Sequence, residues 1–132
     1  MGCSFEFDSV NNILRYSWDG NLTDRMLLEG DAAARRLLAA KPPCRGILDF
    51  TKVASIAASS ETIRRLAFKS PAYGLGQAVV LVAPKDVAYG LSRMFVMLDE
   101  KKRPRMCVVR TMQEAYHLLQ IDSPQFAPIA VP

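Results

Sequence analysis

Alternating polar and apolar positions at the start of the chain predict a β-hairpin. Residues 4–7 alternate, and residues 13–18 alternate again after a turn-rich connection at 8–12. Successive side chains of a strand point to opposite faces of a sheet, so both segments are typical of half-buried strands. We expect Asp19, Gly20 and Asn21, which favour turns, to end the second strand.

Apolar residues spaced by three and four positions predict a helix over about residues 23–40, which Pro42 and Pro43 prevent from continuing. The short apolar run 45–50 is typical of a central strand. A second helix is predicted over 60–69, with Ile63, Leu66 and Ala67 facing inward and Arg64, Arg65 and Lys69 facing outward.

The second half of the chain repeats this alternation of strands and helices. Residues 78–82 are continuously apolar, as expected of a strand that is covered on both faces. A third helix is predicted over 84–98, a strand over 106–109, and a fourth helix from Thr111, which forms a capping box with Glu114, to about Gln120.

The predicted order is β-β-α-β-α-β-α-β-α, which indicates an α/β fold. Strands separated by helices are expected to be parallel and joined by right-handed crossovers, so we predict a five-stranded mixed sheet with four helices. Residues 1–121 form a single domain in this prediction. The proline-rich tail 122–132 is expected to be extended or disordered.

Composition agrees with one globular domain, because half of the 132 residues are hydrophobic. The net charge of +4 is modest and the charges are interspersed, so no nucleic-acid partner is expected, and the basic loop 101–105 is interpreted as a solvated connection. No apolar run reaches the roughly 18 residues of a membrane span, and we expect a cytoplasmic protein. The three widely separated cysteines predict neither a disulfide framework nor a metal site.

Candidate catalytic residues are few. His117 is the only histidine, and no nucleophile or carboxylate stands at a recognisable catalytic spacing from it. Asp49 at a strand end and Asp86 near a helix start are the carboxylates to inspect, and both positions suit structural roles. We therefore expect a protein that is not an enzyme and that uses no cofactor.

The segment 47–53, followed by small residues and then Ser59 and Ser60, resembles the STAS domain, the fold of anti-sigma-factor antagonists. The stretch 83–95 is similar to the SpoIIAA-like branch of that family. The resemblance implies a small bacterial regulatory (signalling) or ligand-binding domain without catalytic machinery. It also implies that Ser59, with Ser60 beside it, is a phosphorylation site; the alternative is that Ser59 is a helix N-cap and nothing more.

The third helix carries more apolar residues than one core stripe needs. Its predicted core residues are Val87, Ala88, Leu91, Met94, Phe95 and Leu98. Tyr89, Val96 and Met97 are left over, and they suggest a contact surface for a partner protein or for a homodimer. The alternatives are a cover formed by Phe126, Ile129 and Val131 of the tail, or incidental exposure.

Two functions follow from these observations. The first is a regulatory interaction module that docks a partner protein through the loop before the second helix and the outward faces of the second and third helices. The second is a carrier or sensor of an apolar, lipid-like ligand, because the resemblance extends to a wider fold group that includes lipid-transfer domains. Its pocket would open between those two helices and be lined by Phe68, Tyr73, Leu91 and Phe95.

Overall fold

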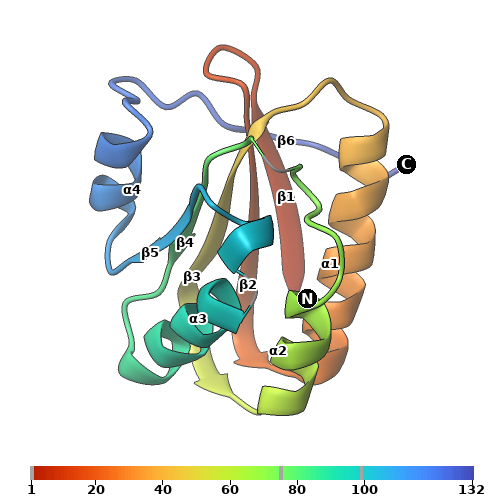
Figure 1. Cartoon of the computed structure of the whole chain (residues 1–132). Helices are drawn as coiled ribbons and strands as arrows, with labels where there is room; N and C mark the ends of the chain where they lie inside the picture. The colour runs from red at the N-terminus through yellow and green to blue at the C-terminus, as the bar shows by residue number, and fades with distance from the viewer. Residues whose placement is uncertain (1, 75, 99) are drawn as a thin grey trace.

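The structure is a computed structural model that describes residues 2–74, 76–98 and 100–132. A mixed sheet and the helices that cover it make up the described chain (Figure 1). In chain order the elements are β1 (Cys3–Asp8), β2 (Ile13–Leu22), α1 (Asp24–Ala39), β3 (Arg45–Ile56), α2 (Ser60–Ala67), β4 (Val79–Val82), α3 (Asp86–Leu98), the 3-10 turn η1 (Glu100–Lys102), β5 (Met106–Val109), α4 (Met112–Leu118) and β6 (Ala127–Pro128).

The strands lie in the order β5-β4-β3-β2-β1-β6. Strands β2 to β5 are parallel, whereas β1 pairs antiparallel with β2, and β6 antiparallel with β1. The predicted α/β class and mixed sheet are confirmed. The predicted strand count was wrong, because the sheet has six strands and not five.

The sixth strand comes from the tail that was expected to be extended or disordered. Ala127 pairs with Phe7, and the backbone N–H of Ile129 donates to the carbonyl of Phe5 at 3.1 Å. Pro128 lies on the edge strand, where a missing N–H does not interrupt the sheet. The tail therefore covers the edge of β1, and it lies at the opposite end of the sheet from β5 and α3 (Figure 1).

Strand β2 does not end at the predicted turn. It continues to Leu22 beside β3, with shifts of register between Ser17 and Asp19 and again between Gly20 and Asn21. Gly20 has φ +74°, a conformation that glycine adopts without steric cost. The turn-favouring residues thus produce an irregular continuation of the strand, and β3 extends to Ile56 alongside it.

Helices α1, α2 and α3 lie on one face of the sheet, and α4 lies on the other (Figure 1). Three successive right-handed crossovers in one direction place their helices on the same face. We call the face covered by α1, α2 and α3 the helical face, and the opposite one the α4 face. Residues alternate between the two along each strand: in β2, Ile13 belongs to the α4 face and Leu14 to the helical face.

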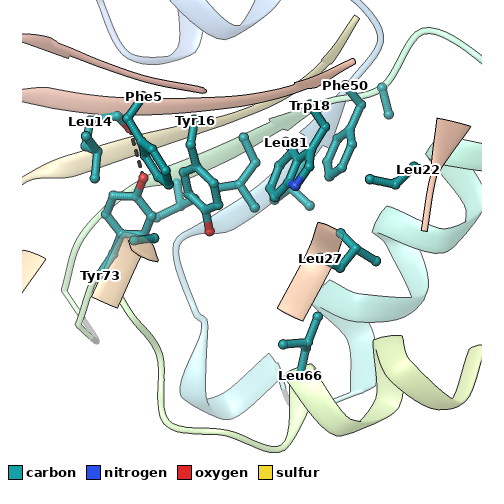
Figure 2. Packing of buried hydrophobic residues seen from close by; sticks show 14 of the residues in the cluster. Phe5, Leu14, Tyr16, Trp18, Leu22, Leu27, Phe50, Leu66, Tyr73 and Leu81 are labelled. Carbon is teal, nitrogen blue, oxygen red and sulfur yellow. Dashed lines mark hydrogen bonds between the residues drawn. The ribbon is translucent and has the colours of Figure 1, made fainter. Parts of the chain in front are cut away.

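Aromatic side chains form much of the core on the helical face (Figure 2). The Trp18 and Phe50 rings are stacked, with centroids 4.8 Å apart and planes 4° apart. Farther along the same face, the Tyr73 hydroxyl donates to the carbonyl of Leu14 at 2.9 Å. Gly46 lies so close beneath the Tyr73 ring that a Cβ atom there would overlap it, which explains why a glycine is needed within β3.

Candidate functional site

Ser59 lies at the junction between the end of β3 and the start of α2. It is the N-cap of α2, and its side-chain oxygen accepts a hydrogen bond from the backbone N–H of Thr62 at 3.2 Å. Its own backbone N–H donates to Oδ1 of Asp24 at 2.7 Å, and its hydroxyl lies 3.1 Å from Oδ2 of the same residue. Asp24 is the first residue of α1, so one exposed serine joins the N-terminal ends of two helices.

The carboxylate of Asp24 is the electrostatic centre of this junction. The backbone N–H of Ser59, the hydroxyls of Thr62 and Ser59, and the charge of Arg65 hold the pKa of Asp24 below its ordinary value. Asp24 is therefore negatively charged at neutral pH. The sequence did not reveal this partner of Ser59, because 35 positions separate the two residues and Asp24 belongs to a run of alternating charges.

The two roles considered for Ser59 stand differently, because the N-cap is seen in the structure and phosphorylation stays a prediction. The N-cap role is present, as the bond from Thr62 shows. The hydroxyl is also exposed, as a phosphorylation site requires. Ser60 is exposed as well, in the first turn of α2, and the exposed residues Arg64 and Arg65 follow on the same helix.

The three left-over residues of α3 do not share one exposed patch. Tyr89 and Val96 are half-buried and pack against the core of the helical face, whereas Met97 is 59% exposed. The Arg110 guanidinium lies over the Tyr89 ring, 4.0 Å from its centroid. Val87, which was expected in the core, is 63% exposed, so the buried stripe of α3 is rotated from the predicted one.

An apolar cavity of about 70 Å³ lies between the sheet and the helices of the helical face. Leu91 and Phe95 line it, as the carrier hypothesis expected for its pocket. Phe68 and Tyr73 are not among its lining residues, because Phe68 is 56% exposed and Tyr73 packs farther along the sheet beside Gly46. Tyr16, Trp18 and Phe50, which sequence reasoning missed, form aromatic walls of the cavity.

Arg103 differs from the rest of the basic loop because it is buried. Its guanidinium donates to the carbonyls of Ala67 at 2.6 Å, Lys69 at 3.2 Å and Leu66 at 3.3 Å. These carbonyls lie at the C-terminal end of α2, where helices leave acceptors unpaired and favour a positive charge. The interpretation of this loop as a solvated connection was thus wrong for Arg103, which also stacks on Phe95.

The two candidate carboxylates have structural contacts of their own. Asp49 accepts hydrogen bonds from the Ser17 hydroxyl and the Thr51 N–H, and Asp86 forms an ion pair with Arg110 at 2.7 Å. His117 is exposed on α4. Burial raises the pKa of the Cys3 thiol to about 11 and also raises the pKa values of Cys44 and Cys107, which disfavours the reactive thiolate in each case.

No family model matches the sequence, and no curated protein matches it either. The STAS resemblance therefore remains a prediction. The described helices include none that is long and apolar enough to cross a membrane. Among the described residues, no group of three or more His, Cys, Asp or Glu side chains is arranged to hold a metal ion.

Proposed function

We propose that this protein is a non-catalytic regulatory module that docks a partner protein through the surface around Ser59. One observation carries the proposal: the exposed Ser59 hydroxyl lies at the N-terminal end of α2 and is joined to Asp24 of α1. The STAS resemblance assigns partner contact to this same loop. The exposed Arg64 and Arg65 side chains extend the surface along α2.

The contacts of Ser59 also support its use as a phosphorylation switch. A phosphate adds close to two negative charges, and the free N–H groups at a helix N-terminus favour negative charge. The negative charge of the Asp24 carboxylate, which accepts hydrogen bonds from Ser59, would repel this phosphate. Phosphorylation of Ser59 would therefore break the link between α1 and α2 and change the shape of the docking surface.

The test is affinity capture with the full chain as bait, comparing wild type with Ser59→Asp. Ser123→Asp is the matched control, because it adds the same charge at an exposed serine of the tail. We expect at least one protein that wild type and Ser123→Asp retain equally and that Ser59→Asp loses by about tenfold. Equal retention on all three baits would contradict docking at Ser59.

A second candidate function is supported by the cavity of the helical face. Its walls are almost entirely apolar and include four aromatic residues, Tyr16, Trp18, Phe50 and Phe95. Ligand sites in proteins are mostly apolar with a few polar groups, although they usually exceed about 300 Å³. A carrier or sensor of a small apolar ligand would need this cavity to widen, and native mass spectrometry after gentle purification would detect a bound ligand.

A further inference from the structure

The cavity of the helical face combines apolar walls with two side chains that carry a hydroxyl group. Tyr16 and Ser92 both line it, and each is only 5% exposed. Figure 2 shows the Tyr16 oxygen pointing away from the sheet, whereas the Tyr73 oxygen points back to Leu14. Within the part of the chain that the structure describes, neither the Tyr16 nor the Ser92 hydroxyl has a hydrogen-bond partner, and both are open to the cavity.

No described side-chain oxygen is fully buried without a partner, so these two hydroxyls reach space that a water-sized group can enter. Burial, followed by the charge of Asp31, raises the pKa of Tyr16 far above its ordinary value. Tyr16 therefore keeps its proton at neutral pH and is able to donate a hydrogen bond. A hydroxyl group both donates and accepts, so Tyr16 and Ser92 together suit a ligand group with the same capacity.

The charge around the cavity indicates that the ligand is neutral. Asp31 also lines the cavity, but its carboxylate is already paired with Arg35 at 2.9 Å and Lys69 at 3.4 Å. An anionic ligand would find no cationic side chain among the residues that line the cavity, and a cationic ligand would find only a carboxylate that is already paired, so each would lose its hydration without compensation. A neutral hydroxyl incurs neither penalty.

The size of the cavity limits the ligand to a small molecule. Its volume of about 70 Å³ is less than half of the roughly 150 Å³ that holds benzene in an engineered protein cavity. The wall formed by α3 is the one that can yield, because Leu91 and Phe95 are only half-buried. A modest shift of Leu91 and Phe95 would make room for a ligand no larger than a single ring.

We propose that this cavity binds a small neutral ring compound carrying one hydroxyl group, which exchanges hydrogen bonds with Tyr16 and Ser92. The aromatic walls contact the ring, and the two protein hydroxyls select its polar end. This inference rests on the second candidate function and names its ligand class. It is independent of docking at Ser59.

Phenol and toluene are suitable probes, because they have the same number of heavy atoms and differ in the hydroxyl group. Trp18 is the only tryptophan of the chain and lines the cavity, so its fluorescence reports occupancy directly. We expect saturable changes with both probes and about three- to tenfold tighter binding of phenol, the net effect of one hydrogen bond.

Tyr16→Phe and Ser92→Ala each remove one hydroxyl and keep the apolar walls. We expect Tyr16→Phe to reduce or abolish the preference for phenol and to leave toluene binding unchanged, and Ser92→Ala to reduce the preference. Tyr116→Phe is the matched control, because Tyr116 packs on the α4 face, and it should keep the wild-type preference. Circular dichroism would verify that each variant is folded.

Two results would overturn the inference, and they have different consequences. Equal affinity for phenol and toluene in wild type would contradict selection by Tyr16 and Ser92 but would preserve an apolar ligand site. The absence of any fluorescence change with either probe would contradict the carrier function as well.

Discussion

The two faces of the sheet are covered in different ways. Three helices cover the helical face, and they still leave a cavity of about 70 Å³ beneath them. The α4 face is covered by one helix of seven residues and by Phe126 of the tail, yet Ile13, Ile47 and Val82 on it are completely buried. The larger cover is thus the one beneath which the apolar cavity lies.

The shapes of the side chains explain this difference. On the helical face the strands present large rings, such as Tyr16, Trp18 and Phe50, and these three rings line the cavity. On the α4 face they present β-branched residues, such as Ile13 and Val82, which pack well on a pleated surface. Functional space is therefore expected on the helical face.

On each face, one buried charged side chain fixes a segment that covers the sheet. Arg103 holds the C-terminal end of α2 over the helical face. Asp8 holds the tail that brings Phe126 over the α4 face, because its carboxylate accepts a bond from the Gln125 N–H at 2.8 Å. Changing each charge in turn tests how much it stabilises its own face.

Arg103→Ala should give the largest effect, because it leaves several carbonyls at the end of α2 without their charged donor. We expect a loss of about 3 kcal/mol in the free energy of unfolding, measured by urea denaturation. Arg105→Ala is the control, since Arg105 is exposed and donates only to the carbonyl of Gly76 among the described residues. A change below about 0.5 kcal/mol is expected there. Equal losses in the two variants would contradict a structural role for Arg103.

Matched substitutions of alanine on the two faces should have effects of opposite sign. Ala115 is completely buried where α4 packs on the sheet, so Ala115→Leu should destabilise the protein by about 2 kcal/mol through overpacking. Ala88 lines the cavity, so Ala88→Leu should stabilise the protein by about 1 kcal/mol, because the larger side chain fills part of the cavity. Chemical denaturation of both variants measures the difference. Destabilisation of similar size in both would mean that the helical face has no usable space.

Asp8→Asn should have a small effect, and that effect depends on pH. Burial raises the pKa of Asp8, but hydrogen bonds from Asn11, Gln125 and Val10 outweigh it and hold the pKa below its ordinary value. The stability that the carboxylate contributes is therefore present above about pH 4, its unfolded value, and is lost as pH falls through the folded value.

We expect Asp8→Asn to cost about 1 kcal/mol at pH 7 and progressively less below about pH 4. Thermal unfolding of both proteins between pH 7 and pH 3 measures this change. A difference that stays constant over that range would show that the charge of Asp8 does not hold the tail.

The strand and helix order could be predicted because each element carries its own periodicity. The α2 residues Ile63 and Leu66 are buried as predicted, and the capping box at Thr111 is present. The sixth strand could not be predicted, because a two-residue strand has no periodicity and depends on the edge of β1. The predicted buried stripe of α3 was wrong for a related reason. The packing of Tyr89 against Arg110 and the core decides which side of the helix is buried.

The candidate site was only half predictable. Ser59 was identified from the sequence, because an N-cap serine is a local signal. Its partner Asp24, the buried role of Arg103 and the aromatic walls of the cavity depend on contacts between residues far apart in the chain. Local patterns do not contain that information.

The central claim is that a partner protein docks on the exposed surface around Ser59, which extends along α2 to Arg64 and Arg65. Photo-crosslinking in the native cell tests it most directly, with a photoreactive amino acid placed at Arg64 on α2 or at Gln113 on α4, both of which are exposed. We expect a defined crosslinked product from position 64 and none from position 113. A product from position 113 alone, or from neither position, would contradict the claim.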